Sequence, residues 1–204
     1  ILDISQLEAE SLQFNKQSID VVELCNQLLI SSEAKGNSEN EFELQTNETR
    51  LMMEIDINHF QQVLLNLLSN ADKFTEKGTI KLQIIACSDE VKFMVKDTGC
   101  GIPLEMQTKI FERFVKVDDY KQGSGLGLPI CQLTVEKWGG KIWACSLSSF
   151  STAFSRCASR LRVAIIVSPL GSWAMNFSNS RSFSNSLMAR KRVEYLCLIC
   201  SLCE

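Results

Sequence analysis

Two asparagines and a lysine recur at helical spacing in the middle of the chain. They are Asn66, Asn70 and Lys73, within the segment FQQVLLNLLSNADKF. Steps of four and three residues place these side chains on one face of a helix. Amide oxygens are hard, neutral ligands that suit Mg²⁺ beside water and phosphate oxygens, and a lysine ammonium is a point charge for a phosphate. Taken alone, so short a motif is more often a solvated polar helix face.

A second motif, DTGCGIP, runs from Asp97 to Pro103 at the end of an expected strand. Its glycines, Gly99 and Gly101, allow a tight turn and a close backbone approach to a ligand. An aspartate just before them can accept a hydrogen bond from an exocyclic amine. In isolation, a plain turn at the end of a strand is the favoured interpretation.

A glycine-rich run, GSGLGL, covers residues 123–128 and opens an expected helix. Backbone N–H groups of such a turn at a helix N-terminus form an anion site. The run is not the dinucleotide-binding fingerprint, because no strand precedes it and its third glycine falls one position early. On its own it points only weakly to a phosphate.

The elements that must hold these motifs follow from the hydrophobic periodicity. Apolar residues recur at helical steps over 58–74, which Asp56 or Asn58 can cap, and again over 126–138, which Gly139 and Gly140 terminate. Alternation over 79–86 and 91–95 predicts an antiparallel hairpin, and 141–145 starts another strand. Helices segregated from strands in this way predict an α+β fold: a two-layer sandwich of mixed, mostly antiparallel sheet with helices on one face.

Composition divides the chain into two parts. Residues 1–145 hold 14 Lys+Arg and 22 Asp+Glu, a net charge of −8, whereas 146–204 hold 7 and 2, a net charge of +5. Nine scattered cysteines fit a reducing cytoplasm better than a disulfide framework. The longest apolar stretch, 163–175, is too short and too broken by Pro169 to span a bilayer. Because the chain begins with Ile1, we expect it to come from a longer protein, whose remaining part could hold a membrane segment.

Together, in their order and spacing, the motifs resemble the catalytic, ATP-binding domain of two-component histidine kinases. The matching stretches are FQQVLLNLLSNADKFTEKG, VKDTGCGIP, IFERF, GSGLGLPIC and GGKIW, which are similar to that family's N, G1, F and G2 boxes. The opening ILDISQLEAESL also looks like the end of a second dimerisation helix. The resemblance implies a helix end over 1–16, the catalytic domain over 17–145, and an atypical Ser/Cys-rich tail over 146–204.

The resemblance also implies roles for single residues. Asn70 would coordinate a Mg²⁺ that bridges the triphosphate, with Asn66 beside it, and Lys73 would contact phosphate. Asp97 would bind the adenine amino group, and Phe111 and Phe114 would belong to the ATP lid. The full expected cofactor-binding set is Asp97, Gly99, Gly101, Ile102, Phe111, Phe114, Gly123, Gly125, Leu126 and Gly127, and the implied cofactors are ATP and Mg²⁺.

The function implied is that of a fragment of a sensor histidine kinase. It would transfer the γ-phosphoryl of Mg-ATP to a histidine of the dimerisation domain, for relay to a response regulator. The resemblance further implies a homodimer in the intact protein, no nucleic-acid partner, and a cytoplasmic location, including the cytoplasmic part of a membrane-bound sensor. Two alternatives stay open: a non-catalytic nucleotide-binding module, and a gyrase- or chaperone-type ATPase. Asn66 argues against the ATPase, because those enzymes have a water-activating glutamate at its position.

Three features depart from the family. The single histidine, His59, stands where the family usually has arginine, and we expect it on the helix surface. Because it lies in the asparagine helix and not in a dimerisation helix, the acceptor histidine must lie upstream or on another molecule. Asp72 would place a carboxylate near the buried helix face, where an unpaired charge is costly, unless it reaches solvent. Residues 146–204 hold 14 serines without clear alternation, which indicates a frame-shifted end or a divergent extension. Their Cys197, Cys200 and Cys203 lack the fourth ligand of a structural zinc site.

Overall fold

The computed structural model describes residues 14–35, 39–87, 90–117, 123–146 and 161–167. The helix expected over 1–16 therefore lies almost entirely outside the described residues, which begin with a short irregular segment at 14–16. The cysteines at 197–203 also lie outside them.

The described residues form seven strands, three α-helices and two 3₁₀ turns. In chain order they are β1 (Gln17–Asp20), α2 (Val21–Lys35), β2 (Glu41–Thr46), β3 (Met52–Ile55), α3 (Ile57–Phe74), β4 (Thr79–Ala86), β5 (Val91–Asp97), the 3₁₀ turns η1 (Leu104–Met106) and η2 (Lys109–Phe111), α4 (Gly127–Lys137), β6 (Lys141–Ser146) and β7 (Leu161–Val167).

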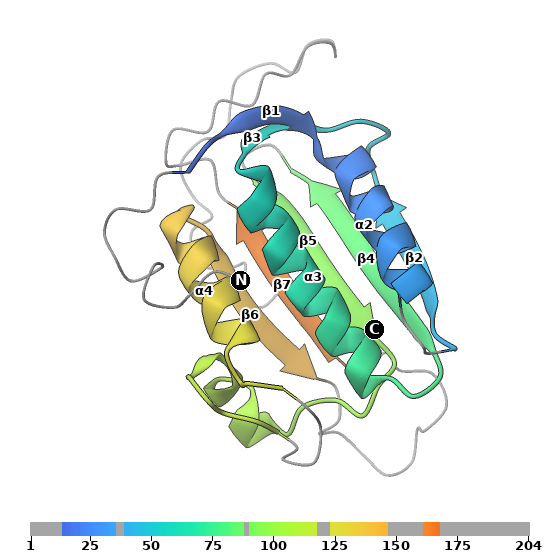
Figure 1. Ribbon diagram of the computed structural model, residues 1–204, viewed down its shortest axis with the longest axis vertical. Helices are drawn as coiled ribbons and strands as arrows, with labels where there is room; N and C mark the ends of the chain where they lie inside the picture. The colour runs from blue at the N-terminus through green and yellow to red at the C-terminus, as the bar shows by residue number, and fades with distance from the viewer. Residues whose placement is uncertain (1–13, 36–38, 88–89, 118–122, 147–160, 168–204) are drawn as a thin grey trace, which may run out of the picture.

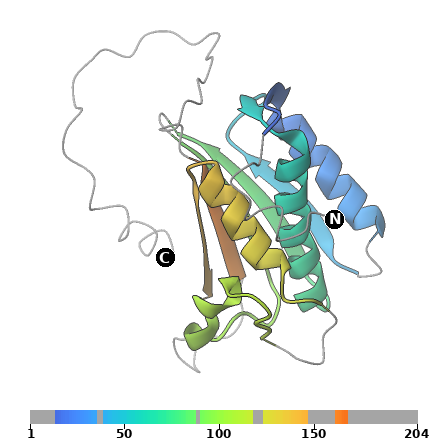
Figure 2. The same cartoon turned by 60° about the vertical axis from the view of Figure 1, so that its left-hand side comes forward.

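Within the described residues, five strands form the main sheet in the order β2-β4-β5-β7-β6. In this described sheet β2 and β4 run parallel, and the other neighbouring pairs are antiparallel. Strands β1 and β3 form a separate antiparallel pair at one end. Helices α2, α3 and α4 cover the same face of the sheet, as Figures 1 and 2 show. The predicted α+β sandwich, with a mixed and mostly antiparallel sheet, is confirmed.

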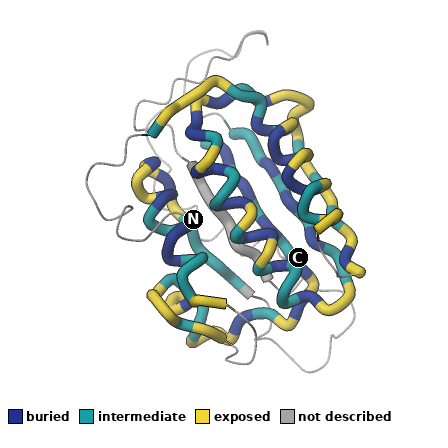
Figure 3. Tube along the Cα trace, viewed as in Figure 1, coloured by how far each residue is buried: buried dark blue, intermediate teal, exposed yellow. Residues whose placement is uncertain are grey.

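The core lies between the sheet and its three helices. Helix α3 turns its apolar residues inward, including Phe60, Leu64 and Leu68, and β4 and β5 bury every second residue. Figure 3 shows buried residues recurring along α3 and along the strands behind it. Because the apolar face of α3 is fixed by this packing, the opposite positions carry its polar residues.

The start of α3 corrects the prediction for His59. Asp56 is the N-cap, as expected, and its Oδ1 accepts the His59 backbone N–H at 3.0 Å. The His59 side chain is buried rather than on the surface: its residue is 9% exposed, and Nδ1 lies 2.8 Å from Asp56 Oδ1. The Phe14 ring meets the imidazole edge-on at 5.1 Å, and the Asn15 backbone N–H donates to Asp56 Oδ2. Contacts from a distant segment therefore cover this side chain, which helix periodicity alone could not reveal.

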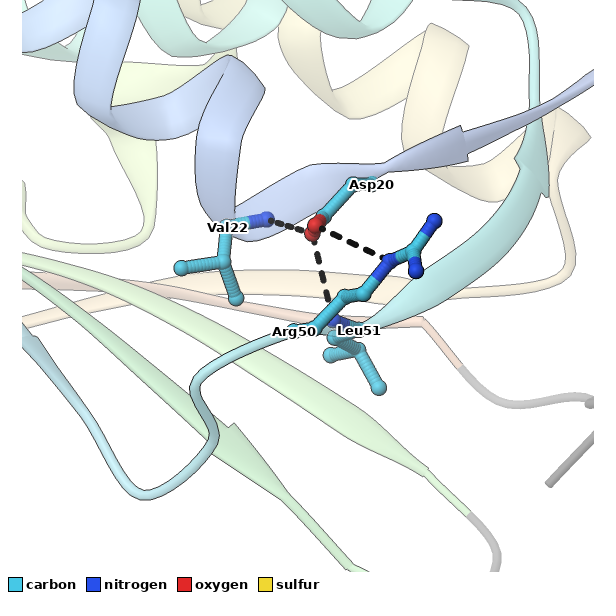
Figure 4. Close-up of polar contacts among 4 residues, drawn as sticks. All are labelled: Asp20, Val22, Arg50 and Leu51. Carbon is cyan, nitrogen blue, oxygen red and sulfur yellow. Dashed lines mark hydrogen bonds and ion pairs between the residues drawn. The ribbon is translucent and has the colours of Figure 1, made fainter. Parts of the chain in front are cut away.

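A second aspartate ties the small sheet to α2. Asp20 Oδ1 accepts the backbone N–H groups of Val22 and Leu51, both at 3.1 Å, and Oδ2 lies 3.6 Å from Arg50 Nε (Figure 4). One carboxylate thus caps the start of α2 and holds the segment that enters β3. This corner fixes the end of the sandwich farther from the glycine-rich turns.

Strand β7 lies within the range expected to be an atypical tail. It pairs with β5 on one side and β6 on the other, with Ala164 opposite both Met94 and Trp143. The sheet therefore does not end at residue 145, and this part of the expectation is corrected. The segment LRVAIIV has apolar residues at alternate positions, but the surrounding serines conceal that pattern.

Among the described residues, none of the helices has the length and apolar character needed to cross a membrane.

Candidate functional site

A pocket opens beside α3 at the end nearer its C-terminus. One wall comes from α3 itself, through Leu67, Asn70, Ala71 and Phe74. The floor comes from β5 and the turn that follows it, through Val95, Asp97, Gly101 and Ile102. The remaining wall is formed by Ile110, Val115, Lys116, Val117, Gly123, Gly125 and Leu128. The pocket is mostly apolar with a few polar groups, which is the usual character of a small-molecule site.

Asp97 is the most deeply buried polar group in this pocket. The residue is 1% exposed; its Oδ1 accepts the Gly99 backbone N–H at 2.9 Å, and its Oδ2 has no hydrogen-bond partner among the described residues. Burial raises the pKa of this carboxyl to about 6, although the Gly99 hydrogen bond opposes the shift. An acceptor left unsatisfied in an apolar pocket is costly unless a ligand donates to it.

The turn after Asp97 packs directly on the end of α3. A β-carbon on Gly99 would lie 2.4 Å from the Phe74 carbonyl oxygen, so only glycine fits this approach. The next residue, Cys100, donates its backbone N–H to the same carbonyl at 3.3 Å. The close contact explains why the motif needs glycine at its third position.

The polar face of α3 meets the glycine-rich turn. Lys73 Nζ lies 3.1 Å from the point that a β-carbon of Gly123 would occupy, and 5.1 Å from the centre of the Phe74 ring. Asn66 points to the start of α4: its Nδ2 lies 3.5 Å from the Gly127 carbonyl oxygen and 3.7 Å from Cys131 Sγ. The three motifs are therefore adjacent in space, although 61 residues separate Asn66 from Gly127.

The segment before the glycine-rich turn is held by its backbone. Phe114 donates its N–H to the Gly125 carbonyl at 3.1 Å and adopts φ +63°, while its side chain is 70% exposed. Gly125 has φ +71°, and a β-carbon there would lie 2.8 Å from Phe114 Cα. Phe111, by contrast, packs against the core. The two predicted lid phenylalanines thus have different surroundings.

The predicted site residues fall into two groups. Those that line the pocket are Asn70, Asp97, Gly101, Ile102, Gly123 and Gly125. Those that are not among its lining residues are Asn66, Lys73, Gly99, Phe111, Phe114, Leu126 and Gly127. The sequence prediction missed the apolar walls, because residues such as Leu67 and Val95 follow the same periodicity as the core. It also missed Lys116, a lysine two residues after Phe114 that no motif singled out.

The chain matches a family model described as histidine kinase-, DNA gyrase B-, and HSP90-like ATPase, over residues 55–163. It is 32% identical over 162 residues to the sensor histidine kinase WalK of Bacillus subtilis, which covers 76% of this chain and 26% of WalK. The chain thus spans about a quarter of the length of that relative.

Solved structures agree with the sequence matches. Full-length ShkA in complex with AMPPNP is 25% identical, with a TM-score of 0.69 over 84% of this chain and 34% of ShkA. ThkA in complex with the response regulator protein TrrA is 26% identical, with a TM-score of 0.60 over 75% of this chain and 41% of ThkA. The chain therefore belongs to the histidine kinase-, DNA gyrase B- and HSP90-like ATPase family, and its domain is the catalytic, ATP-binding domain of the sensor histidine kinases.

Proposed function

We propose that this chain binds Mg-ATP in the pocket beside α3 and transfers the γ-phosphoryl group to a histidine of a dimerisation domain. The observation that carries the proposal is Asp97, whose buried Oδ2 has no hydrogen-bond partner in the described part of the chain and lies at the floor of an apolar pocket. The adenine amino group would donate a hydrogen bond to this oxygen, and the flat purine ring would fit the apolar pocket. Gly101 and Ile102, on the pocket floor, would pack against the apolar faces of the base.

The phosphate end of the ligand would lie towards Asn70 and the glycine-rich turn. Lys73 lies beside Gly123 there and supplies a positive charge. The donor set fits a magnesium ion bound together with a nucleotide, because Asn70 offers a neutral amide oxygen at the pocket wall and the phosphates would supply further oxygens. When bound, the ion would neutralise phosphate charge. Asn66 would lie beside the ion and offer it a second amide oxygen.

In the proposed transfer, a histidine nitrogen attacks the γ-phosphorus and the bond from that phosphorus to the β,γ-bridging oxygen breaks, so ADP leaves. The chain's own residues hold the nucleotide in place and neutralise charge, which is the main task in phosphoryl transfer. His59 is not suited to the acceptor role, because it is buried against Asp56 and Phe14. The acceptor therefore belongs to a dimerisation domain, in a homodimer of the intact protein, with a response regulator as the next partner.

ATP hydrolysis is the weaker alternative. Water activation needs a basic side chain, and the amide of Asn66 has none. The position therefore has no carboxylate to activate water, and the Asn66 Nδ2 instead lies within hydrogen-bond distance of the Gly127 carbonyl and Cys131 Sγ. We expect slow hydrolysis and efficient transfer.

Two measurements test the proposal. The chain should bind a fluorescent ATP analogue in the presence of Mg²⁺, and with radiolabelled ATP it should label a supplied histidine-bearing dimerisation domain in trans. Since an ionised Asp97 is the better acceptor, affinity should fall as the pH drops through about 6, and Asp97→Asn should remove that dependence. Failure to bind the analogue would refute the proposal. Binding without labelling would instead identify a non-catalytic nucleotide-binding module, and rapid phosphate release without an acceptor would identify an ATPase.

A further inference from the structure

Asp72 lies in the last turn of α3 and is held by a residue from a different part of the chain. Asn40 Nδ2 lies 2.9 Å from Asp72 Oδ1, 2.9 Å from the Thr75 carbonyl oxygen and 3.5 Å from the Asp72 carbonyl oxygen. Asp72 is half-buried and Asn40 is 6% exposed. Asp72 was expected either to reach solvent or to weaken the domain; it is half-buried, and the buried amide of Asn40 binds its carboxylate.

Asn40 performs the task of a helix C-cap from 32 residues away in the sequence. The last carbonyl groups of a helix lack intrahelical donors and need partners from elsewhere. Here the Asp72 and Thr75 carbonyls face Asn40, and the Phe74 carbonyl accepts the Cys100 N–H. A negative side chain in the last turn is unfavourable to the helix dipole, so the bond from Asn40 to Asp72 also offsets that electrostatic cost.

Lys73 lies between the residues that these bonds hold. Its backbone is flanked by Asp72, bound to Asn40, and by Phe74, bound to Cys100. Its Nζ lies beside Gly123 of the glycine-rich turn. The position of that ammonium at the phosphate end of the pocket thus depends on how firmly the last turn of α3 is fixed.

We propose that Asn40 is a positioning residue for the phosphate end of the site: through Asp72 and Thr75 it fixes the last turn of α3, and with it Lys73. This inference rests on the proposed nucleotide-binding function. A positioning role for Asn40 predicts different effects at the phosphate end and at the adenine end of the ligand. Asp97 ends β5 and accepts the Gly99 N–H within its own turn, so the adenine end depends on Asn40 less directly than Lys73 does.

The test compares ATP with adenosine, each displacing a fluorescent adenine nucleotide from the full chain. Asn40→Ala should weaken ATP binding about fivefold to tenfold, the factor expected for one ordinary hydrogen bond, and should change adenosine binding by less than about twofold. Asn47→Ala is the matched control. Asn47 follows the other end of β2 and exchanges two hydrogen bonds with Ala86, far from the pocket lining. It should leave the ATP-to-adenosine ratio unchanged.

A donor–acceptor exchange keeps the inference testable if Asn40→Ala folds poorly. Asn40→Asp places a carboxylate against that of Asp72 and should weaken ATP binding more than Asn40→Ala does. Adding Asp72→Asn restores a donor opposite an acceptor and should recover at least part of the ATP affinity. Equal losses for ATP and adenosine, or no rescue in the double variant, would overturn the positioning role. If the unaltered chain binds adenosine but does not prefer ATP, the proposed function fails first, and the two failures are distinct.

Discussion

At the scale of single residues, Asp97 carries the sharpest conflict between stability and binding. Burial raises its pKa to about 6, above the unfolded value of about 3.9. The stability that it contributes is therefore fully present below about pH 4 and is lost as the pH rises through about 6. At neutral pH the buried carboxylate therefore lowers the stability of the free chain, while it offers a hydrogen-bond acceptor to a ligand.

Asp97→Asn should accordingly stabilise the free chain at neutral pH while weakening nucleotide binding. The amide keeps an oxygen for the Gly99 N–H and removes the buried charge. We expect the free energy of unfolding to rise at pH 8 by on the order of 1–3 kcal/mol, and the difference to shrink towards zero near pH 4. Urea denaturation at both pH values measures this. The same gain at the two pH values would show that ionisation is not its cause.

Gly125 is a second residue whose effect can be isolated. It has φ +71°, and a β-carbon would collide with the Phe114 backbone at 2.8 Å. Gly139 has a similar φ of +77°, but a β-carbon there would meet nothing within 4 Å. Both alanine variants should lose ~1 kcal/mol of stability from the unfavourable φ. Only Gly125→Ala should also displace Phe114 and weaken binding of the ATP analogue, and equal binding by the two variants would argue against this role.

At the scale of elements, Asp56 combines two functions at the start of α3. It caps the helix through the His59 N–H, and it holds the segment before β1 through the Asn15 N–H. Although burial opposes ionisation of Asp56, the hydrogen bonds from His59 and Asn15 outweigh it and lower the carboxyl pKa. Asp56 therefore stabilises the fold above its unfolded pKa, and that contribution is lost as the pH falls through the lower folded value.

Substitutions can separate these two functions of Asp56. Asp56→Ser keeps a good N-cap but has one oxygen for two donors, whereas Asp56→Ala loses both contacts. We expect Asp56→Ala to destabilise the chain by about 1–2 kcal/mol at pH 7, and Asp56→Ser by less. Hydrogen exchange should show that the Asn15 amide loses protection in both variants. If that amide exchanges equally in Asp56→Ser and in the unaltered chain, Asp56 is a helix cap and nothing more.

The elements also show what periodicity can and cannot predict. Helix α3, the β4–β5 hairpin and α4 were predicted to within a few residues, because each has a local apolar pattern that its packing preserves. Burial of His59 and the cap on Asp72 were missed, since Phe14 and Asn40 reach them from distant segments. For the same reason, motifs predicted the polar groups of the site, while its apolar walls could not be told apart from core residues.

At the scale of the whole molecule, the sheet depends on a strand that is far in sequence from one of its two neighbours, β5. Strand β7 lies between β5 and β6, and it is the only neighbour that β6 has in the described sheet. A frame-shifted tail without structural value would not be expected to supply a central strand in register. The pairing of Val91 with Val167 and of Asp97 with Leu161 extends along all of β5.

Removing β7 should therefore cost more than removing a surface tail. A chain that ends at Ser146 leaves β6 without a partner and exposes the edge of β5. We expect it to lose cooperative unfolding in urea, while a chain that ends at Val167 keeps every strand of the sheet and unfolds cooperatively. Ala164→Pro in the full chain provides a test without truncation, because a proline in a central strand removes a ladder hydrogen bond and should lower the stability of the sheet. If the chain ending at Ser146 and the Ala164→Pro variant both unfold with the midpoint and slope of the unaltered chain, residues 161–167 do not form part of the sheet. The domain would then end near residue 145, as composition alone indicates.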